Sequence, residues 1–228
     1  MKFLFSSYSS DLSVRDSKKC SLLINSNWYQ RNWKDKYNLT QDTDAKLENN
    51  KMGNRIATSV DGMGTGEGGD VIIVDDPHKA KEASSSVKRK SVIDWWQETM
   101  STRLNDQKTG AKIIIMQRLH QKDLTGHVLA SELGYEHLCL PHRYEGENRC
   151  KTSLHFKDPR RKIGQSLWQD KFDDKCLTAL ENSLGQYATA GQLYQARLWR
   201  FHELTGSDDN VGGAIPSGTI LKEFVMCR

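Results

Sequence analysis

The sequence predicts an α/β protein built around a mainly parallel sheet. Two short apolar runs carry this prediction, VIIVDD at residues 71–76 and KIIIM at 112–116. Strands that are apolar along their whole length are typical of parallel sheets, whose two faces are both covered by helices. Segments with helical periodicity alternate with these strands, as expected in an α/β domain.

The first part of the chain gives a strand, a helix and a second strand. KFLFSSYS at 2–9 predicts a strand, and Asp11 can cap a helix that ends near Asn25. Residues 27–50 are polar with interspersed aromatics, so we expect loops and short elements there. NRIATSV at 54–60 predicts a strand, and the glycine-rich stretch that follows predicts a loop before the strand at 71–76.

The remaining elements follow Pro77, which ends the strand. A helix is expected over 86–105, because Ile93, Trp96, Met100 and Leu104 recur at helical spacing. The other elements expected after it are a strand at 112–116, a helix at 121–133, a strand at 135–140 and a helix at 172–195. We expect three regions: a partial nucleotide-hydrolysing domain at 1–141, a linker and helical subdomain at 142–200, and a divergent tail at 201–228.

Composition excludes several classes of protein. The 228 residues are 36% hydrophobic and 27% charged, with a mean hydropathy of −0.70. No segment approaches the roughly 18 apolar residues that a membrane helix needs, so no membrane partner and a cytoplasmic location are expected. Five cysteines without a C-x-x-C pair argue against a disulfide framework. A formal net charge of +4 permits a nucleic-acid partner without requiring one.

Two adjacent carboxylates end the strand at 71–76, and they are the strongest chemical signal. Asp75 is expected to hold Mg²⁺ through its water shell, and Asp76 to orient or deprotonate an attacking water, as in a Walker B motif. The same pattern also fits a buried strand that stops at polar residues before a turn. Both interpretations stay open on the pattern alone.

The glycine-rich stretch is expected to be a loop close to phosphates or DNA, where bare backbone can approach closely; its candidate residues are Gly64, Gly66, Glu67 and Gly68. A plain flexible loop is the alternative. The G-x-G-x-x-G spacing precedes a strand, whereas a dinucleotide-binding loop follows one, so a Rossmann site is disfavoured. No Lys-Ser or Lys-Thr closes the stretch, so it is not a Walker A loop.

Other candidates lie further along the chain. Gln117, Arg118 and His120 follow the strand at 112–116, where an amide and a guanidinium can sense a γ-phosphate; ordinary surface residues are the alternative. His137, Cys139 and His142 suggest a metal site, but no fourth ligand has zinc spacing, so an ordinary strand is favoured. The basic runs at 88–90 and 160–162 are solvated faces or phosphate contacts.

Taken together, the segments resemble the large terminase subunit of tailed bacteriophages. The resemblance covers residues 1–197 and depends on several landmarks in order: SSYSSDLSVRDS at 6–17, RIATSVDGMGTGEGGDVIIVDDPH at 55–78, WWQETMSTRLND at 95–106, IIIMQRLHQKDLTGHVL at 113–129, EHLCLP at 136–141 and GQYATAGQLYQAR at 185–197. Such subunits are P-loop ATPases fused to a metal-dependent nuclease, and they pump DNA into a prohead. The resemblance implies ATP and Mg²⁺ as cofactors. It implies double-stranded phage DNA, a portal protein and a small terminase subunit as partners.

The resemblance also assigns roles to residues of this chain. Asp75 matches the Walker B Mg²⁺ acid, and Asp76 the catalytic carboxylate, which is often Glu in such motors. Gln117 and Arg118 fall in the segment that couples hydrolysis to movement. The expected fold is a P-loop-like three-layer domain that lacks its first strand and Walker A loop, because in the family that loop lies upstream of SSYSSDLS.

These departures predict an inactive fragment. Without a Walker A lysine we expect weak or no ATP binding by this chain alone, an exposed sheet edge, and possible self-association. Asp208 and Asp209 are expected to be loop residues and not a nuclease metal site, so nuclease activity is not expected. Two alternatives remain: a non-enzymatic module that binds DNA or a partner, and an unrelated NTPase that receives its phosphate loop from another chain.

Overall fold

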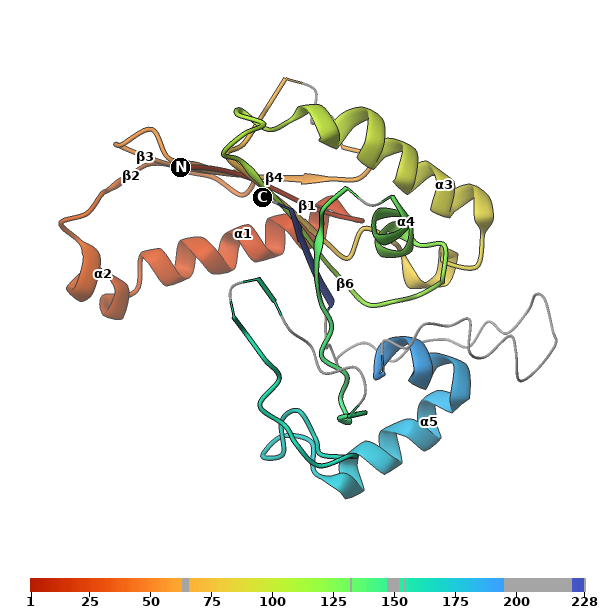
Figure 1. Cartoon of the computed structure of the whole chain (residues 1–228). Helices are drawn as coiled ribbons and strands as arrows, with labels where there is room; N and C mark the ends of the chain where they lie inside the picture. Colours follow the sequence, from red (N-terminus) through yellow and green to blue (C-terminus); the bar gives the residue numbers. More distant parts are fainter. Residues whose placement is uncertain (63–65, 132, 147–151, 154, 195–222, 228) are drawn as a thin grey trace. The chain divides into compact units, whose positions relative to one another are not determined.

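The computed structural model describes residues 1–62, 66–131, 133–146, 152–153, 155–194 and 223–227 (Figure 1). Contacts within the chain divide it into two compact units. Unit 1 comprises 1–77, 91–114 and 227–228, and unit 2 comprises 78–90 and 115–226. The predicted tail at 201–228, with Asp208 and Asp209, lies almost entirely outside the described residues.

Unit 1 is an α/β unit with a mixed, mainly parallel sheet. Its strands lie in the order β2-β3-β4-β1-β5-β6. The bounds are β1 Lys2–Ser7, β2 Leu39–Asp42, β3 Lys46–Asn49, β4 Asn54–Ser59, β5 Val71–Asp75 and β6 Ala111–Met116. β1 pairs in parallel with β4 on one side and with β5 on the other, whereas β2 and β3 are antiparallel additions beside β4. The sequence prediction of a mainly parallel α/β sheet is confirmed at this level.

The central strands bury apolar side chains most completely on one face of the sheet. Leu4 of β1 and Ile72 and Val74 of β5 are fully buried and share that face, whereas Phe5 and Ile73 on the other face are half-buried. Phe5 of β1 lies beneath the guanidinium of Arg55 from β4, with 4.4 Å between Cζ and the ring centroid. Successive side chains along β1 therefore point to opposite faces of the sheet and contact different residues, as in any strand.

Helix α1, Ser10–Ile24, follows β1 and packs on β1 and β4 (Figure 1). Its buried positions are serines, Ser13 and Ser17, four residues apart on one face. Small side chains there let the helix lie close to the sheet. The N-cap residue is Ser9, and the predicted cap Asp11 lies in the first turn, where a carboxylate favours the helix dipole. α2, Asn27–Trp33, follows α1 after a short turn.

The connection from β5 to β6 changes helix type along its length. It contains η1 Ala80–Glu82 and α3 Ser86–Asp94, followed by the π-helical segment η2 Trp95–Thr99 and the 3₁₀ turn η3 Met100–Thr102. The single helix expected over 86–105 was therefore wrong in its regularity and in its end. The π-turn shifts the side chains that follow it, and Trp96 and Met100 are both buried.

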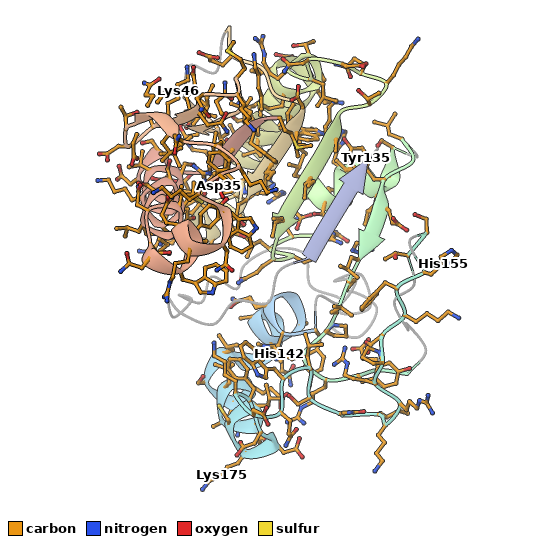
Figure 2. All side chains as sticks on the ribbon, turned by 90° about the vertical axis from the view of Figure 1, so that its left-hand side faces the viewer. Asp35, Lys46, Tyr135, His142, His155 and Lys175 are labelled. Carbon is orange, nitrogen blue, oxygen red and sulfur yellow. The ribbon has the colours of Figure 1, made fainter. Side chains whose placement is uncertain are left out.

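Unit 2 contains α4 Leu124–Ala130, β7 Glu136–Leu138, α5 Asp174–Gln192 and β8 Glu223–Cys227. β7 pairs antiparallel with β8. The strand expected at 135–140 as part of a parallel sheet therefore has an antiparallel partner. Asp173 caps α5 by accepting the Cys176 N–H, and Gly185 interrupts the helix with φ of 73°. His142 lies beside α5 and is labelled in Figure 2. Its backbone N–H donates to the Leu193 carbonyl at 2.8 Å. No helix in the described part of the chain combines the length and apolar content of a membrane span.

Candidate functional site

Three parallel strands of unit 1 end in oxygen-bearing side chains at one edge of the sheet. The strand register places Ser7 of β1 level with Ser59 of β4 and with Asp75 of β5. Since parallel strands all finish at the same edge, hydroxyls and a carboxylate gather where the strands end. The sequence expectation that Asp75 stands at the carboxyl end of a parallel strand is met by β5.

The strand order of the sheet reverses between the neighbouring strands β1 and β5. From β1 the chain runs through α1 to β4, on one side of β1; from β5 it runs to β6, on the opposite side. The chain that follows β1 therefore leads to one side of this strand pair, and the chain that follows β5 leads to the other side. In open α/β sheets ligands bind at such switch points. Asp75 and Asp76 lie at this position.

Asp76 has a backbone conformation that L-residues rarely adopt. Its φ is 46°, in the left-handed region that aspartate tolerates better than most residues. The conformation is anchored, because the Tyr8 N–H from the loop after β1 donates to the Asp76 carbonyl at 3.1 Å. The Val60 N–H, just after β4, donates to the Ser7 carbonyl at 3.0 Å. Backbone hydrogen bonds thus tie together the loops after β4, β1 and β5, and local strain of this kind clusters at functional sites.

The glycine-rich stretch divides into parts with different roles. Gly64 lies outside the described residues. Gly66 has φ of 108° and open space around its Cα, and Glu67 beside it is exposed. A Cβ on Gly68 would lie 2.7 Å from Asn105 Oδ1 and 2.9 Å from the Arg103 carbonyl oxygen, so this glycine allows close packing on the segment before β6. The loop role near phosphate or DNA stays a prediction for Gly66 and Glu67, and Gly68 has a structural reason to be glycine.

Arg118 lies in unit 2 and is held by a buried carboxylate. Its Nε donates to Asp123 Oδ2 at 3.1 Å, and its Nη2 donates to the Gln121 carbonyl at 3.3 Å. Arg118 is 7% exposed and Asp123 is fully buried. Gln117, the residue before it, is half-buried. The coupling or phosphate-sensing role of both residues stays a prediction, and the ion pair fixes the orientation of the guanidinium.

Sequence analysis missed Asp123, which organises the loop between β6 and α4. Its Oδ2 also accepts the N–H groups of Leu119 and His120 at 3.1 and 3.2 Å. Its Oδ1 accepts the Gly126 N–H at 2.9 Å, which caps α4. The signal was present in the sequence as an aspartate directly before a helical segment, the usual N-cap pattern.

Sequence analysis also missed His78, which lies in unit 2. Its Nε2 accepts the Leu124 N–H at 2.9 Å, so this imidazole is neutral and carries its proton on Nδ1. Burial lowers the pKa of His78 to about 4, which keeps Nε2 free to accept. The histidine after the acidic pair thus has a structural role at the start of α4.

The donor set at the end of β5 fits magnesium better than a softer metal. Carboxylate and hydroxyl oxygens are the hard ligands that Mg²⁺ takes, and one or two carboxylates suffice because the ion keeps several waters. Within the described residues no group of three or more His, Cys, Asp or Glu side chains is placed to hold a metal. His137 lies in β7, whereas Cys139 and His142 follow that strand.

Two comparisons with known proteins found no match to this chain. No protein-family model matches the sequence, and a search of curated proteins found no match. The fold and the position of the acidic pair are therefore the evidence on which a function must be proposed.

Proposed function

We propose that the chain is the ATPase-domain portion of a DNA-packaging motor that resembles the large terminase subunit of tailed bacteriophages. The observation that carries this proposal is the position of Asp75 and Asp76 at the switch point between β1 and β5. Nucleotide-hydrolysing α/β domains use that edge for the metal–phosphate group, and the terminase-like landmarks in the sequence support the same assignment. The proposed fold is the P-loop type of three-layer α/β domain.

In this proposal Asp75 holds Mg²⁺ through bound water, and Asp76 orients the attacking water. Ser7 and Ser59, level with Asp75, supply further oxygen atoms at the same edge. The ion, when bound with ATP, neutralises charge on the β- and γ-phosphates. The side chain of Asp76 is one methylene shorter than the glutamate common in such motors, so its backbone conformation determines how far its carboxylate reaches.

The proposed motor has DNA and two proteins as partners, and the isolated chain is expected to hydrolyse little ATP. Double-stranded phage DNA is the substrate that is moved, and a portal protein and a small terminase subunit are the protein partners. The sequence contains no G-x-x-x-x-G-K-[S/T] loop, so the chain by itself has no lysine of that kind to grip the phosphates. We therefore expect little or no ATP turnover by the isolated chain.

A non-enzymatic module that binds DNA or a protein partner is the second candidate. The observation that favours it is the same absence of a phosphate-binding loop from the sequence. In this alternative the α/β scaffold is kept while its basic surfaces make the contacts. Binding of DNA would then need neither nucleotide nor Asp75.

The test measures metal binding and hydrolysis on the same protein. Mn²⁺, a spectroscopic substitute for Mg²⁺, is titrated in the absence of ATP, which would chelate the ion itself, and free Mn²⁺ is followed by electron paramagnetic resonance. We expect Asp75→Asn to remove the bound ion. Asp44→Asn is the control, because Asp44 is an exposed residue of the β2–β3 turn that pairs with Lys18.

ATP hydrolysis is measured in parallel, with and without double-stranded DNA. Mn²⁺ binding lost in Asp75→Asn but kept in Asp44→Asn supports a metal site at the end of β5. Equal binding by the wild type and Asp75→Asn, with both proteins folded by circular dichroism, would refute the proposed site. Turnover that Asp75→Asn abolishes would contradict only the expectation of inactivity.

A further inference from the structure

Helix α2 of unit 1 displays aromatic side chains without burying any of its residues. Trp28 is 56% exposed and Trp33 is 38% exposed, whereas Trp96 in the same unit is 4% exposed. Tryptophan in a folded protein is largely buried on average, so two exposed indoles on one seven-residue helix need an explanation. Figure 1 shows α2 beyond the end of α1, at the margin of unit 1.

The rings hold one another in place. Trp28 and Trp33 meet edge to face with centroids 5.1 Å apart, and Tyr29 lies 4.9 Å from Trp33. Tyr29 in turn shares a hydrogen bond of 2.6 Å between its hydroxyl and that of Tyr37. We call these four residues, Trp28, Tyr29, Trp33 and Tyr37, the α2 aromatic cluster. These contacts fix the positions of the four rings, so the rings are already arranged when a ligand binds to the cluster.

Positive charge accompanies the cluster. Residues 27–36 contain Arg31, Lys34 and Lys36 against one acid, Asp35, which gives 3 − 1 = +2 in ten residues, where the whole chain has +4. All four charged side chains are exposed. Figure 2 labels Asp35 on the face that it turns toward the viewer. Cations interleaved with open aromatic rings match a ligand that carries both negative charge and flat apolar faces.

We propose that the α2 aromatic cluster and its flanking cations form a binding surface for single-stranded nucleic acid. An unpaired base presents its π-face to Trp28 or Trp33, and the phosphates of the same strand meet Arg31, Lys34 and Lys36. A duplex hides those base faces within its own stack, so single strands are preferred. The inference needs no nucleotide, no metal and no part of the site at Asp75, so it stands apart from the proposed function.

The alternative occupant is a second copy of the chain, because Leu22 and Leu23 at the end of α1 are also exposed. Aliphatic side chains favour protein contacts, whereas three cations on one short segment oppose the close approach of an identical segment. The charge therefore favours the nucleic acid. Self-association is measured in the test as the competing outcome.

The experiment is a titration of fluorescently labelled oligothymidylate with the full chain, followed by anisotropy without Mg²⁺ or nucleotide. Trp28→Ala is expected to weaken binding by about 5- to 150-fold, since stacking on one base contributes roughly 1–3 kcal/mol. Trp168→Ala is the matched control, because Trp168 is also 56% exposed but lies in unit 2 beneath Lys171. Lys34→Gln is expected to lower the slope of log affinity against log salt by about 0.7.

Binding that is lost in Trp28→Ala and kept in Trp168→Ala and Asp44→Asn supports the inference. Three outcomes would overturn it: equal losses in the two tryptophan variants, tighter binding of the matching duplex, or a Trp28→Ala effect confined to self-association in sedimentation velocity. Circular dichroism confirms that each variant is folded. Failure here leaves the Mn²⁺ result at Asp75 untouched, and the converse also holds.

Discussion

His142 makes unit 2 sensitive to acid. The side chain is 1% exposed, and its ring meets Phe172 edge to face at 5.0 Å. Among the described residues neither ring nitrogen has a hydrogen-bond partner. The pKa of His142 is lowered to about 4, first by burial and then by the charges of Arg160 and Arg143, against the opposing effect of Glu181.

The sign and size of the effect follow from this pKa. The folded-state pKa is depressed, so between pH 6.5 and pH 4 the unfolded chain binds a proton at His142 that the folded chain does not. The contribution of the neutral His142 ring to the free energy of unfolding is therefore complete above the pKa of the unfolded state. It is lost as the pH falls toward the pKa of the folded state. The difference of 6.5 − 4 = 2.5 in pKa corresponds to about 3 kcal/mol.

The assay is urea unfolding by circular dichroism at pH 7 and pH 4, on the wild type and on His142→Phe. Phenylalanine keeps an aromatic ring against Phe172 and removes the titrating group and two unpaired polar atoms. We expect His142→Phe to lose about 3 kcal/mol less than the wild type over this interval. His78 also titrates in this range, but it is common to both proteins and cancels. The same pH dependence in both would refute the burial argument.

Three further predictions concern stability, each measured by urea unfolding at pH 7. Asp123→Ala should cost about 3–5 kcal/mol, because it leaves the Arg118 guanidinium buried without its carboxylate; a loss below about 1 kcal/mol would contradict that role. Asp158→Asn should cost a similar amount through Arg160, whereas Asp174→Asn, whose carboxylate is 76% exposed, should cost less than about 1 kcal/mol. Asp76→Gly should leave stability unchanged or raise it by about 1 kcal/mol, since glycine adopts φ of 46° without strain, and a clear loss would show that the side chain supports the turn.

The strands of unit 1 could be predicted because their signals are local. β1, β4, β5 and β6 each carry an apolar or alternating run bounded by polar residues, and each appears within a residue or two of its expected bounds. The acidic pair was recognised for the same reason, since an apolar strand that ends in carboxylates is a contiguous pattern. The sheet order, in which β1 becomes central, is not contiguous and came from the structure.

Features that depend on distant partners escaped prediction. The role of Asp123 depends on Arg118 and on backbone groups of the preceding loop, and periodicity does not report such contacts. The π-turn at Trp95 is a local distortion of a segment whose apolar spacing looks regular. β7 forms an antiparallel pair with a strand near the end of the chain, and nothing in the segment around Glu136 reveals the direction of its partner.

The central place of β1 has a consequence for the order in which the protein folds. Lys2 pairs with Asn54, and Phe3 pairs with Val71, so β1 waits for two partners that are made much later. At roughly 5–20 residues per second, synthesis of the chain from Phe3 to Val71 takes on the order of 3–14 s. Until then one side of Phe3, Leu4 and Phe5 has no strand, and before β4 is made neither side has one. Assembly of the sheet is dominated by non-local pairing, which makes its folding slow for the size of the unit and dependent on protection of nascent β1.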